Sequence, residues 1–167
     1  MAPARARREV ASCGHNARVT LILLLKVVHI LAAIVAVGSN VTYAFWLRRA
    51  GLDRDRLIFT IEGIRLLDSR IANPAYVLVL LTGLGMVALG AFSFTTGWIL
   101  AAIALYVALV VVGLAFFSPA IKRQLEEAQR DSTSRAYAAA AARSNLFGIG
   151  TLVVVLVIVF LMVTKPF

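Results

Sequence analysis

The chain has a long central stretch that carries no formal charge. From Ile71 to Ile121 there is no Asp, Glu, Lys or Arg, a run of 51 residues. One membrane-spanning helix needs about 20 apolar residues, so this stretch is long enough for two spans joined by a tight turn. Two further uncharged runs, 27–47 and 144–164, are each one span long. The sequence therefore predicts an all-α membrane protein, a four-helix transmembrane bundle.

The expected spans account for most of the chain. They cover about 19–47, 73–92, 98–118 and 145–164. Of the 167 residues, 61% are hydrophobic, above the roughly 45–50% of soluble domains. We therefore expect a single four-span domain over residues 19–167. Residues 1–18 form a basic N-terminal tail, which we expect to be disordered or to reflect a start codon assigned too early.

Two charged connections join the spans in pairs, over residues 53–70 and 121–143. In the first, apolar residues recur at helical spacing, which predicts either an amphipathic helix in the membrane interface or an extension of the second span. Asn73 and Pro74 suit the first turn of a helix and mark where that span begins. The second connection is rich in alanine, which predicts helical structure that continues the third span.

The distribution of basic residues predicts the orientation. The two connections, together with Arg48 and Arg49 at the end of the first span, hold 11 Lys and Arg, while the opposite side holds 5. The positive-inside rule therefore places the connections in the cytoplasm and both termini outside. The net charge of +9 matches contact with anionic lipid headgroups of the bilayer. We expect no nucleic-acid binding, because no basic groove alternates with aromatic side chains.

One face of the first span is small and polar. Lys26, His29, Ala33, Ala36 and Asn40 follow one another at spacings of three and four residues, so they share a helix face. Such a face is typical of a surface that packs against other helices inside a bilayer. We expect Ala33, Ala36 and Asn40 to be packing positions.

His29 is the residue most suggestive of chemistry, because an ionisable side chain within a span indicates a functional site. It is a candidate axial haem ligand, metal ligand or proton relay. The alternative is a neutral imidazole that is hydrogen-bonded to Tyr106 or Asn40. Lys26, one turn away, either extends to the headgroups or pairs with a carboxylate such as a porphyrin propionate.

The later spans offer mainly packing positions. Gly83, Met86 and Gly90 share a face of the second span, and Met86 is also a weak candidate for a second axial ligand. Gly113 and Gly148 are expected to pack in the third and fourth spans. We identify no catalytic residue and no metal-binding cluster, since the chain has no HExxH, no CxxC and no nucleotide-binding loop. These observations favour a protein that is not an enzyme.

Two segments carry a family resemblance. The stretch Leu25–Ile34 followed by Gly38, and the stretch Arg70–Tyr76 running into Leu80–Gly83, resemble an uncharacterised bacterial family of integral membrane proteins, described as a domain of unknown function. That family is distantly similar to copper-resistance protein D and to the four-helix membrane protoporphyrinogen oxidases. The resemblance spans roughly residues 21–123 and implies a bacterial cytoplasmic membrane location.

The resemblance also implies a role for one side chain. In the oxidases a histidine of the first helix ligates haem, and the matching position is His29. The oxidases also use a basic residue in a later helix, whereas spans two to four carry none. Copper handling would rely on His29 with the scattered methionines Met86 and Met162.

Three functions are therefore open from the sequence. The first is an accessory or scaffold subunit, either as a homo-oligomer or within a larger membrane complex. The second is haem b or porphyrin binding through His29 as axial ligand. The third and weakest is copper or small-solute transport.

Overall fold

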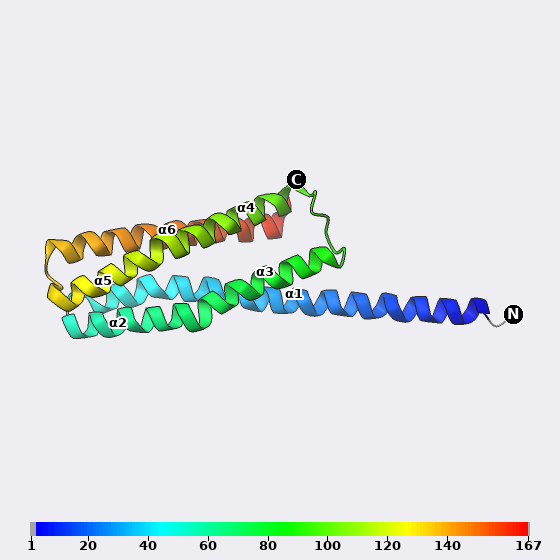
Figure 1. The fold of residues 1–167 in the computed structure, drawn as a ribbon, viewed down its shortest axis with the longest axis horizontal. Coiled ribbons are helices and arrows are strands. Elements are labelled where there is room, and N and C mark those ends of the chain that lie inside the picture. Colours follow the sequence, from blue (N-terminus) through cyan, green and yellow to red (C-terminus); the bar gives the residue numbers. More distant parts are fainter. Residues whose placement is uncertain (1–2, 167) are drawn as a thin grey trace.

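The computed structural model describes residues 3–166 and consists of long helices arranged as two hairpins (Figure 1). The first helix, α1, covers Pro3–Ala50. The next long helix is formed by α2 (Arg54–Leu67), the π turn η1 (Asp68–Ala72) and α3 (Asn73–Ala88). A third is formed by α4 (Gly97–Val112), the π turn η2 (Gly113–Phe117) and α5 (Ser118–Asp131). The last is α6 (Arg135–Thr164).

Four helices are long and apolar enough to cross a membrane, and the described residues contain no strand. This confirms the predicted all-α four-span bundle. The charged connections extend the spans rather than lying in the membrane interface, because α2 runs through η1 directly into α3. The first connection is therefore an extension of the second span, which is one of the two structures predicted for it.

Each π turn ends two residues before a proline. Pro74 and Pro119 lack the N–H that would bond four residues back. The residue before each proline instead donates five residues back, from Asn73 to the Asp68 carbonyl and from Ser118 to the Gly113 carbonyl. A one-residue widening of this kind lets a helix pass a proline without ending. Both connections can therefore remain helical at the point where they leave the apolar segment.

The N-terminal tail differs from the expectation of disorder. Helix α1 begins at Pro3 and continues without interruption through the first span. No proline follows Pro3 in this segment, so nothing in the sequence ends the helix before the span begins. In Figure 1 this part of α1 projects beyond the end of α3.

Side chains from α1, α2, α5 and α6 form the hydrophobic core at the charged end. Its buried residues are Ala50, Leu57, Ile61, Ile121, Leu125, Ala128 and Tyr137. Two hydrogen bonds reinforce this joint, from Arg54 Nη2 to the Gln129 carbonyl at 2.6 Å and from Ser132 Oγ to the Leu52 carbonyl at 2.9 Å. The two hairpins are thus joined beyond the apolar segments.

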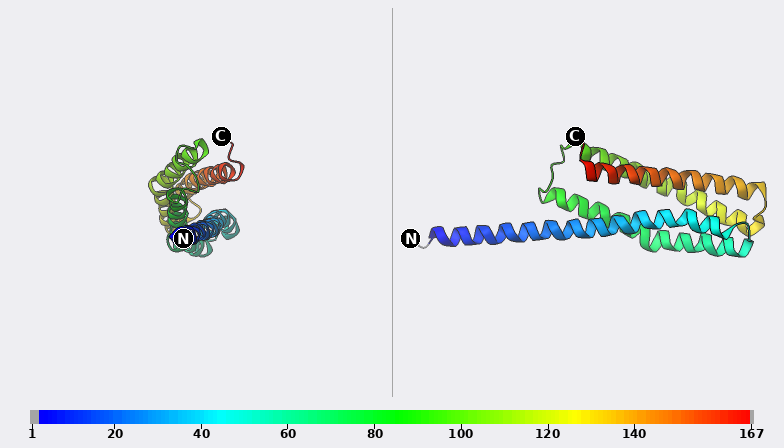
Figure 2. Two further views of the ribbon diagram at one scale, coloured as in Figure 1. Left: turned by 90° about the vertical axis from the view of Figure 1, so that its right-hand side faces the viewer. Right: turned by 180° about the vertical axis from the view of Figure 1, so that it is seen from behind.

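The hairpins separate away from this joint. No Cα atom of α3 lies within 8 Å of one in α4 or α6. The end-on view in Figure 2 shows the α1–α3 pair and the α4–α6 pair on opposite sides of an open arrangement. The apolar segments therefore form two helix pairs without close backbone packing of α3 against α4 or α6, and the Tyr106 hydroxyl of α4 still reaches the Tyr76 carbonyl of α3.

The end of the bundle away from this joint is held by contacts at the helix termini. Arg18 Nε donates to the carbonyl of Leu89, just after α3, at 2.9 Å. A cation at a helix C-terminus satisfies free carbonyls and complements the helix dipole. The Lys165 ammonium lies 5.1 Å from the ring centroid of Phe92 and 5.8 Å from that of Trp98. Aromatic and basic residues of this kind are typical of a membrane interface.

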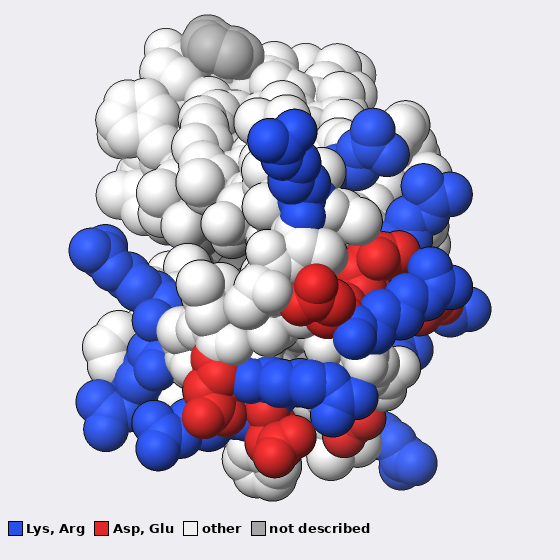
Figure 3. Space-filling model, turned by 90° about the vertical axis from the view of Figure 1, so that its left-hand side faces the viewer, with Lys and Arg blue, Asp and Glu red and all other residues white. Residues whose placement is uncertain are grey.

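The opposite end carries most of the described charge (Figure 3). The ion pairs of the described chain all lie there, and each has solvent-exposed side chains. Both charged connections therefore lie on the same side of the apolar segments.

Candidate functional site

His29 lies between α1 and α3, where its ring meets a hydroxyl. Its Nδ1 is 3.0 Å from Thr82 Oγ1. Thr82 Oγ1 in turn donates to the Leu78 carbonyl at 2.6 Å. Because the contact with Leu78 already uses the single hydroxyl proton, we infer that Thr82 accepts a hydrogen bond from Nδ1–H of a neutral imidazole. In this tautomer Nε2 carries the lone pair, and it forms no hydrogen bond within the described residues.

Gly83 makes room for the imidazole. A Cβ atom at this position would lie 3.3 Å from His29 Cε1, closer than side chains normally approach. The absence of a side chain allows the ring to lie against the backbone of α3. The pair Thr82–Gly83 therefore supplies both the hydrogen bond and the space for His29. Thr82 was not predicted from the sequence, although a hydroxyl next to a glycine within a span was the available signal.

The other expected partners of His29 belong to a separate polar group. Asn40 donates from Nδ2 to the hydroxyl of Tyr76. Tyr106 donates to the Tyr76 carbonyl at 2.8 Å and so links α4 to α3. Neither Asn40 nor Tyr106 bonds to His29, because the antiparallel pairing of α1 and α3 brings His29 to the level of Thr82.

The remaining candidate residues on α1 and α3 lie on both sides of the contact between His29 and Thr82. Ala36 is buried and Ala33 is half-buried. Lys26 is exposed and forms no ion pair with any described side chain. Met86 is buried one turn beyond Thr82, so its side chain is within the helix pair rather than facing the bilayer.

The candidate glycines occupy different environments. Gly90 lies beyond the end of α3 with φ of +73°, a conformation that glycine adopts without strain. A Cβ there would lie 2.9 Å from Arg18 Nη2. A Cβ on Gly148 would touch the Phe117 ring at 3.4 Å, whereas one on Gly113 would meet no atom within 4 Å. Gly148 therefore lies against a neighbouring helix, and Gly113 lies in η2.

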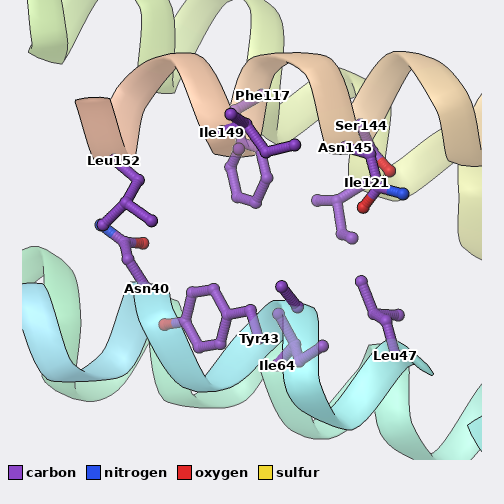
Figure 4. A pocket seen from close by; sticks show the side chains of 12 residues that line it. Asn40, Tyr43, Leu47, Ile64, Phe117, Ile121, Ser144, Asn145, Ile149 and Leu152 are labelled. Carbon is purple, nitrogen blue, oxygen red and sulfur yellow. The ribbon is translucent and has the colours of Figure 1, made fainter. Parts of the chain in front are cut away.

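A cavity of about 50 Å³ lies between the hairpins near the charged end. Figure 4 shows side chains of α1 and α6 facing one another across it. Its polar lining residues are Asn40, Tyr43, Ser144 and Asn145. Tyr43 is 5% exposed, and its hydroxyl makes no hydrogen bond within the described chain. This cavity was not predicted from the sequence, because residues from all four long helices form it.

The described residues contain no group of three or more His, Cys, Asp or Glu side chains that could hold a metal ion. The site therefore offers a single imidazole nitrogen and, apart from it, a small and mainly apolar cavity with four polar residues in its lining. The four apolar helices that hold them define a polytopic all-helical membrane protein. A family model described as "Predicted integral membrane protein (DUF2269)" matches residues 23–166. The chain therefore belongs to this family. No curated protein and no solved structure matches it significantly.

Proposed function

We propose that this protein is a non-catalytic accessory or scaffold subunit that assembles within the membrane, with itself or with other membrane proteins. The observation that carries this proposal is the outer face of α1, where Gly38 and Thr42 are exposed. A Cβ on Gly38 would meet no atom within 4 Å. Small residues four positions apart allow another helix to approach closely inside a bilayer.

This outer face is distinct from the surface that α1 uses within the chain. At 100° per residue, Gly38 and Thr42 lie on the side of α1 opposite Ala36 and Asn40, which face α3. Val41 and Phe45 flank the small residues and are exposed as well. A partner helix could therefore bind here without displacing any contact inside the protein.

The low internal burial of the spans also supports an assembly. The most apolar windows of the four helices are only 11–22% buried within a single chain. The proposed setting is a bacterial cytoplasmic membrane, with both termini outside and the charged connections in the cytoplasm. The positions of the basic residues, which lie predominantly at one end, support this orientation.

The experiment compares Gly38→Leu with Gly63→Leu. Gly63 also has open space around its Cβ position, but it lies in the charged connection. The native complex is extracted in mild detergent, and its mass is measured by light scattering after size-exclusion chromatography. We expect Gly38→Leu to reduce the assembled mass and Gly63→Leu to leave it unchanged. A wild-type protein that always migrates as a lone monomer, or equal masses for both variants, would refute the proposal.

A second candidate function is haem or porphyrin binding through His29. The observation that favours it is the unpaired Nε2, since haem-ligating histidines usually donate from the other ring nitrogen to a neighbouring acceptor. The cavity of about 50 Å³ is too small for a macrocycle, so a porphyrin would lie on the outside of the α1–α3 pair. A second His29 from another copy, or Met86 after rearrangement, would supply the sixth ligand, and Lys26 would pair with a propionate.

The absorption spectrum of the protein tests this second candidate. The protein is purified from haem-supplemented cells, and its spectrum is recorded in the oxidised state and again after reduction with dithionite. A Soret band that is lost in His29→Ala and kept in Lys26→Gln would support it. A colourless wild-type protein would refute it. Copper or small-solute transport remains a weaker alternative that no observed contact favours.

A further inference from the structure

Asp68 is a carboxylate on the inner face of the second long helix. The buried apolar residues of this helix follow helical spacing. They are Leu57, Ile61, Ile64, Ala72 and Ala75. Asp68 takes the place in this series between Ile64 and Ala72, four positions from each, and it is half-buried. A polar group therefore occupies a position where the pattern of the helix calls for an apolar one.

The depth of Asp68 follows from the other three long helices. Each of them changes between charged and apolar sequence at one residue, and these residues are Leu47, Ile121 and Ser144. All three line one cavity together with Ile64, so the four residues lie at a similar depth (Figure 4). Asp68 is four residues beyond Ile64 toward the apolar side, which is about 6 Å along the helix axis. Its carboxylate therefore lies within the apolar layer that the other helices define, where an ionisable group indicates function.

Hydrogen-bonding side chains surround this carboxylate. Asn73 donates from Nδ2 to Asp68 Oδ2 at 3.4 Å. The Tyr43 hydroxyl of α1 lies beside the carboxylate, with no hydrogen bond of standard geometry to it. The Tyr76 hydroxyl of α3 is near enough to interact with its charge. The titratable groups that face Asp68 from the elements packed against it are therefore two tyrosines.

No described basic side chain neutralises Asp68. The ion pairs of the described chain do not include it. Arg65 and Arg70, the nearest basic residues on its own helix, are exposed. Within the described chain η1 packs against α1, α2 and α3, so the cations of α5 and α6 lie outside its immediate surroundings. A carboxyl group in such a setting is disfavoured in its charged form and tolerated when it carries a proton.

The partners of Asp68 suit either protonation state. A hydroxyl can donate a hydrogen bond to a carboxylate or accept one from a protonated carboxyl, and a side-chain amide offers both a donor and an acceptor. A cation beside the group would instead favour its charged form. The side chains of Tyr43 and Asn73 therefore allow Asp68 to bind and release a proton with hydrogen-bonding groups next to it in both states.

The π turn connects this side chain to the backbone. Turn η1 begins at Asp68, whose carbonyl accepts from the Asn73 backbone N–H, while the Asn73 side chain contacts the Asp68 carboxylate. Single π turns within α helices are frequently found at functional sites. A change of charge on Asp68 therefore acts on the segment of helix that packs against α1.

We propose that Asp68 is a proton-binding site that controls the packing of α1 against η1. While these elements are packed, the carboxyl holds a proton taken from water at the charged end. Release of this proton to water leaves a charge that requires hydration, so the contact between α1 and η1 loosens. Because the packed form binds one proton more than the loosened form, packing is favoured at low pH and weakens as pH rises. The α1–α3 pair thereby responds to pH on the charged side of the membrane.

The first test asks whether Asp68 carries a proton. Infrared spectra of the full chain in lipid vesicles are recorded at neutral pH for wild type, Asp68→Asn and Asp55→Asn. Asp55 is the matched control, since its side chain is 92% exposed. We expect the C=O stretch of a protonated carboxyl in wild type and Asp55→Asn, and its loss in Asp68→Asn. A wild type without this band, or an unchanged band in Asp68→Asn, would overturn the proposal.

Hydrogen exchange tests the link between the proton and the packing. Asparagine is a neutral isostere of the protonated carboxyl, so Asp68→Asn should fold and keep the packed form at every pH. Amide exchange of residues 68–73 is followed by mass spectrometry from acidic to alkaline pH and corrected for the intrinsic pH dependence of exchange. In wild type and Asp55→Asn we expect a further rise of up to about tenfold per pH unit, the slope for release of one proton. The same pH dependence in wild type and Asp68→Asn would show that Asp68 does not control the packing.

Discussion

Replacement of Ile61 by alanine tests whether the joint at the charged end holds the two hairpins together. Ile61 is 0% exposed and packs in the core with Leu57 and Ile121. Most of this core lies among the charged connections, beyond the apolar segments, so the alternative environment for its side chains is water. Removing a fully buried isoleucine side chain from such a core costs about 2–5 kcal/mol, through lost burial and the cavity that remains.

The matched control is Leu81→Ala. Leu81 is 61% exposed in the apolar part of α3, where a bilayer or detergent surrounds it in both folded and unfolded states. We expect its loss to change stability by less than about 0.5 kcal/mol. The free energy of unfolding is measured for both variants by titration with sodium dodecyl sulfate in mild detergent, followed by circular dichroism. Losses of equal size in the two variants would refute the conclusion that the water-facing core is the main joint.

Three further predictions concern local contacts. Thr82→Val removes the hydrogen bond to Nδ1 of His29, and we expect a loss of about 0.6 kcal/mol, the mean for hydrogen bonds between membrane helices, in the same unfolding assay; a more stable variant would contradict a stabilising role for this contact. Gly90→Ala forces a Cβ into a left-handed conformation beside Arg18 and should cost at least about 1 kcal/mol; unchanged stability would contradict this. Hydrogen bonds from the Thr133 hydroxyl and backbone N–H lower the pKa of Asp131, so this carboxylate stabilises the fold above its unfolded pKa and loses that effect as pH falls through the lower folded value. Thr133→Val should raise the Asp131 pKa toward its ordinary value, as measured by carbon-detected NMR titration. An unchanged pKa would show that the Thr133 hydroxyl is not the cause of the lowered pKa.

The pattern of charge along the chain was sufficient to predict the four spans. A 51-residue uncharged run leaves few alternatives, because the length of a span is set by bilayer thickness. The continuity of α2 with α3 was less evident, since an amphipathic helix in the interface would show the same apolar spacing. Pro74 does not decide between these alternatives by itself. The π turn before it, which keeps the helix continuous, depends on packing that one sequence does not reveal.

The site could be predicted only in part. His29 was identified because an ionisable residue is rare within a span. Its partner Thr82 was not, because the pairing of α1 with α3 depends on the relative position of two helices. Asn40 and Tyr106 have the right chemistry but lie at a different depth. The cavity required still more information, since its lining residues on α1 and α6 are about a hundred positions apart.

The position of the hydrophobic joint has a consequence for how the hairpins associate. Helices inside a bilayer exchange contacts with lipid for contacts with each other, and little apolar surface leaves water. Here the surfaces that join the two hairpins come together at the charged end, where separation would hydrate them. We therefore expect their association to show the large heat-capacity change of a soluble core and to weaken in urea, although the helices themselves span a membrane.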